Sequence, residues 1–299
     1  MRFIYSTDIH GDKEKYEKLL ELATSSGVQN LVIAGDLLPK NAQDRETLQR
    51  EFIQGWFKDY LRRLQEAQIR FIAILGNDDV EAIEEDYQAM IAEFDNVFDV
   101  NKKKTDIEDC SFIGLSEVLD TPFFRKTRVT IEDGQKMPVQ RHDEIEFGKD
   151  KIKMTTTEWE EFRMHNIPKM DELLAGLPEV TEGQKGIFVF HCPPYGIGLD
   201  VCKDGDVVGS KEMLAYIQEK QPYMSFHGHI HEASRISGKW YANVGQTICM
   251  NCGQSEFGQK DLHIALIDTE RGLYKRGIIP CNPEIKKSME ELLEEDFNR

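Results

Sequence analysis

Three of the eight histidines in this 299-residue chain lie within five positions, at His227, His229 and His231. Other side chains of the kind that bind metal ions stand just after short apolar runs elsewhere in the sequence. Together, the candidate metal ligands are Asp8, His10, Asp36, Asn77, His191, His229 and His231. Asp, Asn and His supply the oxygen and nitrogen atoms that bind divalent ions such as Mn²⁺, Zn²⁺, Fe²⁺ and Ni²⁺. The residue types therefore predict a metal site.

The number of candidate ligands indicates how many ions such a site holds. A single zinc ion takes about four ligands, so this set is too large for one ion. Two ions that share a bridging carboxylate would use the whole set. Glycines stand next to several of these residues, for example Gly35 and Gly228, and they allow sharp turns and close backbone approach.

The apolar runs that precede the candidate ligands are predicted to be strands. In the first half, runs at 2–7, 30–34 and 70–75 alternate with helical patterns at 13–25, 44–67 and 81–94. This βαβαβ order favours a mostly parallel sheet covered by helices. Such sheets bind ligands beyond the carboxyl ends of their strands. Side chains that follow different strands are therefore expected to converge, although the chain separates them widely.

The second half is richer in strands, which are predicted at 110–115, 186–190, 223–226, 240–244, 262–267 and 273–278. A helix is predicted at 211–220. Residues 121–180 are polar and irregular, then helical from about 156 to 177, and we interpret them as an excursion over the sheet edge or a lid. Residues 283–299 fit a short amphipathic helix. We therefore expect a single domain over residues 1–299.

Five short motifs occur in a fixed order: D-x-H from Asp8, G-D at 35–36, G-N-x-D at 76–79, H-x-P-P at 191–194 and G-H-x-H at 228–231. This series resembles the calcineurin-like metallophosphoesterases. The resemblance implies an α/β fold, namely a four-layer α/β/β/α sandwich of two mixed sheets flanked by helices. His227 lies outside the last motif and is expected to pack or to support a ligand.

The resemblance also implies a role for each ligand. Asp8, His10 and His231 would bind a first ion, Asn77, His191 and His229 a second, and Asp36 would bridge them. Two ions about 3.5–4 Å apart can bind a phosphoryl oxygen and a bridging hydroxide that attacks phosphorus in line. We therefore expect a hydrolase of phosphate esters with Asp36, Asn77, Asp78 and His191 as its catalytic residues. Mn²⁺ is the expected ion, with Fe, Zn or Ni as alternatives.

One position departs from the family's pattern. Many members have a histidine after the G-N, where this chain has Asp78, and the acidic partner of that histidine is missing because Leu37, Leu38 and Pro39 follow Asp36. An ionised Asp78 would repel phosphate and could not donate a proton. It would disfavour dianionic monoesters more than monoanionic diesters, which predicts a phosphodiesterase or a hydrolase of activated phosphate esters. Alternatively, Asp78 turns away and caps the following helix.

Two other functions stay open. A phosphomonoesterase, including a protein phosphatase, would use the same ions. A non-catalytic scaffold would keep the fold, but scaffolds tend to lose metal ligands, and here the whole set is present.

Composition narrows the partners. The chain has 37 Lys and Arg against 54 Asp and Glu, a net charge of −17, so stable binding of nucleic acid is not expected. A small-molecule phosphate ester or a nucleotide is the expected substrate, and an oligomer is possible. With no long apolar run and no signal-peptide pattern, we expect a cytoplasmic protein with no membrane partner.

Three smaller features each have two interpretations. The six cysteines are expected to be free thiols, and the C-x-x-C formed by Cys249 and Cys252 is interpreted as ordinary thiols rather than a redox pair. The basic run at 125–128 could clamp a phosphate or be a solvated loop. The helix start at Ser210 could hold an anion, or Ser210 could simply lie at its cap.

Overall fold

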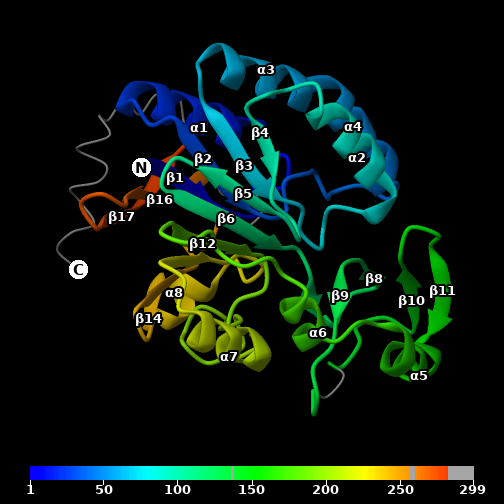
Figure 1. Ribbon diagram of the computed structural model, residues 1–299. Coiled ribbons are helices and arrows are strands. Elements are labelled where there is room, and N and C mark those ends of the chain that lie inside the picture. The colour runs from blue at the N-terminus through cyan, green and yellow to red at the C-terminus, as the bar shows by residue number, and fades with distance from the viewer. Residues whose placement is uncertain (136–137, 256–259, 282–299) are drawn as a thin grey trace.

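The computed structural model describes residues 1–135, 138–255 and 260–281 (Figure 1). Two six-stranded mixed sheets pack against each other, and helices cover the outer face of each. This is the α/β/β/α sandwich that the resemblance to the family implies. The helix predicted at 283–299 lies outside the described residues.

The first sheet has the strand order β17-β16-β1-β2-β3-β4. Its parallel strands are β1 (Arg2–Ser6), β2 (Asn30–Ala34), β3 (Arg70–Ile74) and β4 (Val97–Asp99). The antiparallel strands β16 (Asp261–Asp268) and β17 (Leu273–Pro280) extend it beyond β1. Its outer face packs against α1 (Lys13–Ser26), α2 (Arg45–Phe52), α3 (Lys58–Glu66) and α4 (Glu84–Ile91).

Local sequence explains where these helices begin and end. The side chain of Asp12 accepts hydrogen bonds from the backbone of Glu14 and Lys15 and so caps α1, which ends at Gly27 with φ 65°. The single helix predicted at 44–67 is interrupted, because a π-helical turn (Ile53–Phe57) separates α2 from α3. Gly55 in this turn has φ −106° and ψ −105°, outside the helical range, which a residue without a side chain adopts readily.

The second sheet has the strand order β14-β15-β13-β12-β6-β5. These strands are β5 (Lys104–Ile107), β6 (Cys110–Leu115), β12 (Lys185–Phe190), β13 (Met224–Phe226), β14 (Tyr241–Val244) and β15 (Thr247–Met250). β6, β12, β13 and β15 run parallel to one another. The outer face packs against α6 (Met170–Ala175) and α7 (Lys211–Lys220), and the short helix α8 (Ala233–Ser237) follows β13.

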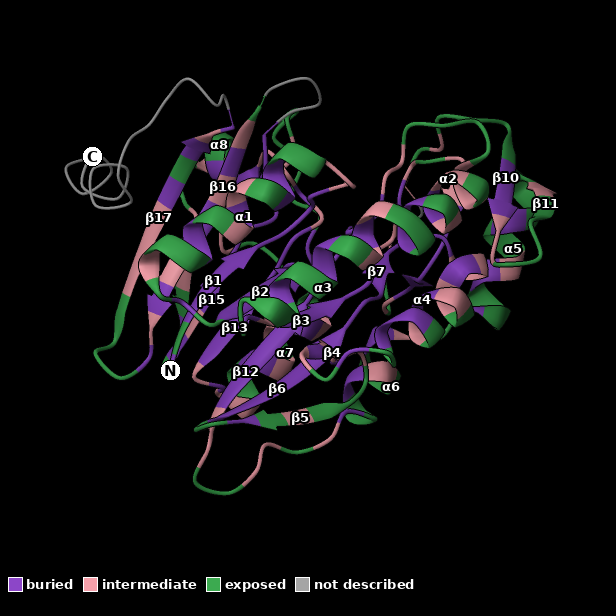
Figure 2. Ribbon diagram, turned by 90° about the horizontal axis from the view of Figure 1, so that it is seen from above, coloured by how far each residue is buried: buried purple, intermediate pink, exposed green. Residues whose placement is uncertain are grey.

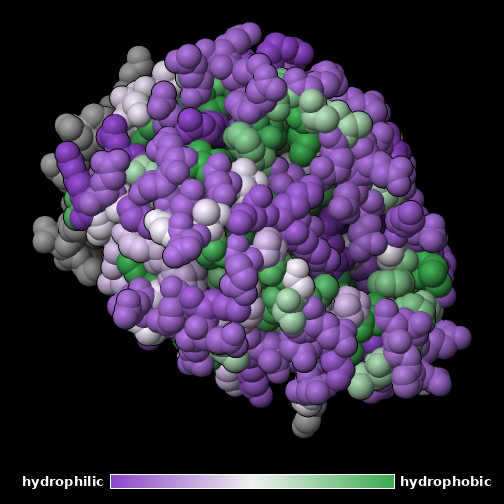
Figure 3. All heavy atoms as spheres, viewed as in Figure 1, coloured by the Kyte–Doolittle hydropathy of each residue, from purple (hydrophilic) through white to green (hydrophobic). Residues whose placement is uncertain are grey.

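A continuous apolar core lies between the two sheets. The ring of Phe3 meets the rings of Phe112 and Phe226 edge to face, and Tyr5 stacks on Phe226 at 4.5 Å between ring centroids. Figure 2 shows the central strands buried between exposed helix surfaces. The face in Figure 3 is dominated by hydrophilic residues, in keeping with the high content of charged residues. No helix of the described part of the chain combines the length and apolar character needed to cross a membrane.

Residues 121–177 form a small subdomain beyond the end of the second sheet, which we call the excursion (Figure 1, lower right). It contains β8 (Arg125–Lys126), β9 (Val129–Thr130), β10 (Glu144–Phe147), β11 (Ile152–Thr155) and α5 (Thr156–Asn166), and ends with α6. Trp159 is fully buried in a separate apolar cluster and donates a hydrogen bond to Asp120. The excursion is therefore more regular than the irregular stretch expected from its polar sequence.

Candidate metal centre

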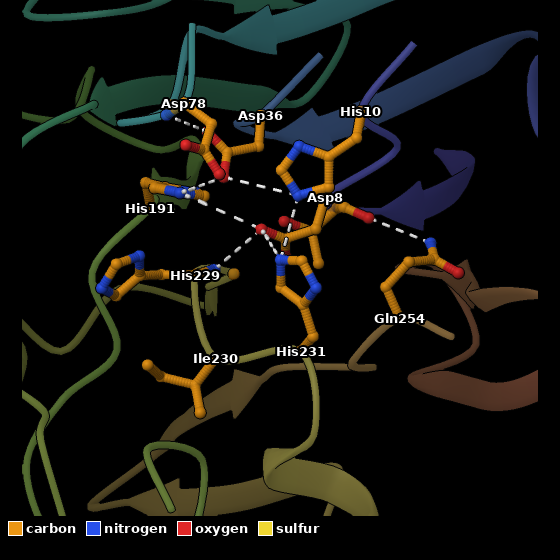
Figure 4. A network of polar contacts seen from close by, with 12 residues as sticks. Asp8, His10, Asp36, Asp78, His191, His229, Ile230, His231 and Gln254 are labelled. Atoms are coloured by element: carbon orange, nitrogen blue, oxygen red, sulfur yellow. Dashed lines mark hydrogen bonds and ion pairs between the residues drawn. The ribbon is translucent and has the colours of Figure 1, made fainter. Parts of the chain in front are cut away.

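The seven candidate ligands gather where the two sheets meet. Asp8 and His10 follow β1, Asp36 follows β2 and Asn77 follows β3 in the first sheet. His191 follows β12, and His229 and His231 follow β13 in the second. Figure 4 shows the side chains of Asp8, His10, Asp36, His191 and His231 pointing toward a common space. The structure thus brings together residues from both halves of the chain.

Four of these residues form a first group. Metal-binding atoms of Asp8, His10, Asp36 and His231 all lie within 4.8 Å of one another. The Nε2 atoms of His10 and His231 are 3.0 Å apart, and His231 Nε2 is 3.3 Å from Asp8 Oδ1. Two imidazoles and two carboxylates directed at one small space are a donor set that suits a divalent cation.

A second group adjoins the first through Asp36. The Oδ1 atom of Asn77 lies 3.1 Å from His191 Nε2 and 2.7 Å from His229 Nδ1. His191 Nε2 is also 3.4 Å from Asp36 Oδ2, the carboxylate oxygen that lies 3.7 Å from His10 Nε2 in the first group. His191 Nδ1 lies 2.7 Å from the carbonyl oxygen of Ala34, which orients the ring with Nε2 toward the site. The two groups therefore share Asp36.

The backbone is unusual at several of these positions. Asp8, His10, Asp36 and His229 all have positive φ, between 51° and 67°. Residues with side chains adopt this left-handed conformation at a cost of roughly 1 kcal/mol, and it is concentrated at functional sites. Gly76 permits the close approach of two loops, because a Cβ atom there would lie 2.3 Å from Asp36 Oδ1.

The protonation states and polar contacts of the site fit bound cations. Burial lowers the pKa of His10 to about 3 and that of His229 to about 4, so both rings are neutral and have a free lone pair. Burial also lowers the pKa of His191, but Asp36 and Asp8 outweigh burial and raise it to about 9. Asp8 Oδ2 is buried with no hydrogen-bond partner among the described residues. The buried carboxylates of Asp8 and Asp36 are therefore stabilised by a positive charge beside them, which a bound cation would supply.

Asp78 lies at the edge of this site and is paired with two basic residues. Its carboxylate lies 2.9 Å from Lys40 Nζ and 2.7 Å from Arg45 Nη1. Burial raises the pKa of Asp78, but the charges of Lys40 and Arg45 outweigh burial and hold it well below its usual range. Asp78 is therefore ionised, and it does not cap the following helix, since Val80 and Ile83 occupy the caps of the next two helical segments. The capping alternative is wrong.

Lys40 and Arg45 are the polar residues that sequence reasoning missed. Both follow the G-D motif closely, after Leu37, Leu38 and Pro39, and their basic side chains at this point of the sequence are the signal that indicates them. Their charges offset that of Asp78, so the expectation that Asp78 repels phosphate needs revision.

The neighbouring Asp79 joins the loops that carry Asp36 and Asn77. It is fully buried, and its carboxylate accepts hydrogen bonds from the backbone N–H groups of Leu37, Leu38 and Gly76 at 2.8–3.0 Å. Burial and the nearby Asp36 raise the pKa of Asp79 to about 7, against the opposing effect of these hydrogen bonds. The residue thus fixes the spacing of two loops that carry candidate ligands.

The excursion supports the loop after β3, which carries Asn77 and Asp79. Thr127 Oγ1 donates to the carbonyl oxygen of Asn77 over 2.5 Å. The guanidinium of Arg128 donates to the carbonyl oxygens of Gly76 and Asp79 and pairs with Glu84 at 3.0 Å. Both residues are buried, and Lys126 is fully buried against Asp120. The basic run at 125–128 is therefore largely a structural anchor rather than a solvated loop.

The remaining features noted in the sequence lie outside the two groups. His227 is fully buried, with Nδ1 2.9 Å from the carbonyl oxygen of Cys192, and burial lowers its pKa to about 3. Ser210 caps α7 by accepting from the backbone of Met213. The carboxylate of Glu132, from the excursion, accepts hydrogen bonds from Ser210 and from the backbone of Lys211. The start of α7 thus already binds an anionic side chain of the protein itself. Cys249 and Cys252 are buried free thiols.

A two-sheet sandwich with a buried cluster of carboxylates and imidazoles at its sheet junction is the arrangement of a metal-dependent phosphoester hydrolase. The chain belongs to the calcineurin-like phosphoesterases, whose family profile matches residues 1–233. This family is metal-dependent and acts on phosphate esters.

One curated protein and two solved structures are similar to this chain. The phosphodiesterase YfcE of Escherichia coli K12 is 37% identical over 81 residues, which are 27% of this chain and 41% of YfcE. The match thus spans less than half the length of that protein. The crystal structure of TT1561 of Thermus thermophilus has a TM-score of 0.54 at 18% identity, covering 93% of this chain and 98% of that one. A further crystal structure with the same coverage has a TM-score of 0.57 at 15% identity. These structures show the shared fold.

Proposed function

We propose that this phosphoesterase is a dinuclear metal-dependent phosphodiesterase. The observation that carries the proposal is the division of the candidate ligands into two adjoining groups that share Asp36. A single ion does not account for both groups, because Asn77, His191 and His229 lie against one another as closely as the members of the first group. Mn²⁺ is the ion we favour, since the mixture of carboxylate, amide and imidazole donors suits it.

Each residue then has a defined task. Asp8, His10 and His231 would hold the first ion, and Asn77, His191 and His229 the second, with Asp36 shared. When bound, the two ions supply Lewis acidity and an activated water to the ester. His191 is held by the carbonyl oxygen of Ala34, and Asp36 by the backbone of Asp78, so neither has to reorganise during the reaction.

The similarity to YfcE favours a diester as the substrate, because Lys40 and Arg45 offset the charge of Asp78, which therefore does not distinguish diesters from monoesters. An ionised carboxylate has no proton to give to a leaving group. YfcE is itself named a phosphodiesterase. A small-molecule or nucleotide diester is therefore the proposed substrate. A phosphomonoesterase is the alternative enzyme. A non-catalytic scaffold is less favoured, because both groups of candidate ligands are present.

The test compares bis-p-nitrophenyl phosphate with p-nitrophenyl phosphate, with Mn²⁺ added. We expect faster turnover of the diester by the wild-type chain and its loss in Asp36→Asn. Asp59→Asn is the matched control, because Asp59 is an exposed residue paired with Arg62 on the helix surface. Faster turnover of the monoester would favour the phosphatase. Bound metal with no turnover of either ester would contradict the phosphodiesterase and favour the scaffold.

A further inference from the structure

Lys40, Arg45 and Asp78 form a charged cluster at the edge of the candidate metal centre, which we call the rim cluster. Lys40 lies in the loop after β2, Arg45 begins α2 and Asp78 lies in the loop after β3. Their side chains are 24%, 18% and 23% exposed, so the cluster borders both the buried centre and solvent. With two positive charges and one negative, its net charge is +1.

Asp78 is fully engaged within this cluster. One carboxylate oxygen binds Arg45 and the other binds Lys40, while its backbone N–H donates to Asp36 Oδ1 over 2.7 Å. The buried amide of Gln49 donates to the carbonyl oxygens of Asp78 and Pro39, which ties the loop before Lys40 to the loop of Asp78. Asp78 is therefore held in place and in turn holds Lys40.

Lys40 has spare hydrogen-bonding capacity, and its ammonium group faces the centre. An ammonium group has three N–H donors. Asp78 Oδ2 accepts one, and Nζ otherwise faces His10 Nε2 at 2.9 Å. His10 Nε2 is one of the atoms that form the first ligand group, so a cation bound there would take up its lone pair. The ammonium would then have donors free beside the centre.

The chemistry that such an ammonium recognises is an anionic oxygen. Lys40 lies beside the space enclosed by the first ligand group, where an ester held by that group would present its phosphate oxygens. We infer that Lys40 binds the phosphate group of the substrate and that Asp78 and Arg45 position it. The inference rests on the proposed phosphoesterase function. The sequence predicts that Asp78 repels the phosphate group, whereas this inference has Lys40, the partner of Asp78, attract it.

The test measures binding of orthophosphate to the full chain loaded with Mn²⁺, after excess metal has been removed, by calorimetry. Lys40→Met is expected to weaken orthophosphate binding about tenfold or more, the effect of one charge-assisted hydrogen bond. Lys40→Arg is expected to stay within a few-fold of wild type. Asp78→Asn, which leaves Lys40 charged but loosens it, is expected to have an intermediate effect.

Two controls make these results specific. Lys58→Met removes a lysine that pairs with Glu93 on the helix surface and should change nothing. Bound Mn²⁺, measured for every variant by elemental analysis, should stay at the wild-type amount, because the rim cluster contributes no candidate ligand. In turnover of a diester, Lys40→Met should raise KM more than Asp78→Asn does.

The outcomes separate this inference from the proposed function. Wild-type protein that binds orthophosphate through Lys40 but hydrolyses no ester would contradict the proposed function and support the role of Lys40. Unchanged orthophosphate affinity in Lys40→Met, or loss of Mn²⁺ together with phosphate, would overturn the inference, because the lysine would then be dispensable or would act on the metal centre. Failure of the wild type to bind orthophosphate would overturn it as well.

Discussion

The backbone N–H of Asp78 donates to the Oδ1 atom of Asp36 over 2.7 Å, so one carboxylate oxygen of Asp36 is engaged by the neighbouring loop. The other oxygen, Oδ2, is left to face His10 and His191. This contact directs the carboxylate shared by the two ligand groups. The contact requires the loop after β2 and the loop after β3 to approach closely, which is possible because Gly76 has no side chain.

Gly76→Ala is therefore expected to abolish most of the activity. The added Cβ would lie 2.3 Å from Asp36 Oδ1 and 2.4 Å from its backbone nitrogen, so the shared carboxylate must move. A displacement of about 1 Å at a catalytic centre costs on the order of 100-fold in kcat/KM. Diester turnover and Mn²⁺ content would be measured together. Gly176→Ala, whose Cβ meets nothing closer than 3.5 Å, is the control, and equal activity of the two variants would contradict this account.

Thr127→Val tests the support that the excursion gives to Asn77. The substitution keeps the shape of the side chain but removes the hydrogen bond to the Asn77 carbonyl oxygen. We expect a loss of about 1 kcal/mol in the free energy of unfolding and about a tenfold lower kcat/KM, since a buried acceptor is left unpaired in the backbone of a candidate ligand. Urea unfolding and diester turnover measure the two effects.

The control for this prediction is Thr24→Val. Thr24 donates to the carbonyl oxygen of Leu20 on an exposed face of α1, far from the site in the sheet sandwich. It should leave turnover unchanged. A Thr127→Val chain that loses stability but retains full kcat/KM would show that the contact is structural only.

Glu132→Ala is expected to destabilise the protein through α7. The carboxylate of Glu132 accepts from the hydroxyl of Ser210 and from the backbone N–H of Lys211, in the first turn of that helix. Losing a carboxylate from a helix N-terminus costs about 1–2 kcal/mol in the free energy of unfolding. Urea unfolding would measure the loss. Asp133→Ala, at an exposed neighbour paired with Lys169, should cost far less.

Alkaline pH is expected to weaken the fold through its buried thiols. Burial raises the pKa of Cys192, Cys249 and Cys252 to about 12, whereas thiols of the unfolded chain ionise near about 8.5. Between these values the unfolded chain binds fewer protons than the native one, so the free energy of unfolding falls as pH rises. The contribution is complete below about pH 8 and is lost progressively toward pH 12.

Urea midpoints at pH 7.5 and pH 10 measure this effect. We expect the midpoint to fall at the higher pH, and to fall less in Cys249→Ala than in wild type. Equal midpoints at both pH values would contradict the prediction. Native-state reaction with a thiol reagent at pH 8 should be slow at these three cysteines and faster at the half-buried Cys202.

The central strands were predictable because their sequences are nearly continuous apolar runs. The predicted runs at 30–34, 70–75 and 110–115 match β2, β3 and β6 almost residue for residue. The strands of the excursion were missed, since β8 and β11 are short, contain no continuous apolar run and are defined by pairing within a small sheet. The break at Gly55 was missed because the apolar spacing of the helix continues across it.

The convergence of the ligands was predictable, but their surroundings were not. Polar residues that follow neighbouring parallel strands lie at the same edge of the sheet. The order of strands and helices along the chain was enough to predict this. The pairing of Asp78 with Lys40 and Arg45 depends on the conformation of two loops and on where α2 begins. An ionised Asp78 is one of two interpretations of the sequence, and neither includes its pairing with Lys40 and Arg45.

The distribution of the candidate ligands over both sheets bears on how the protein folds. His10 and His231 lie 221 positions apart in the chain, yet their ring nitrogens are 3.0 Å apart. Contacts between such distant segments form late, because the entropy lost in closing so long a loop must be offset first. A folding chain with only its first sheet in place would hold only part of each ligand group. Uptake of metal during refolding would therefore report the moment at which the two sheets dock.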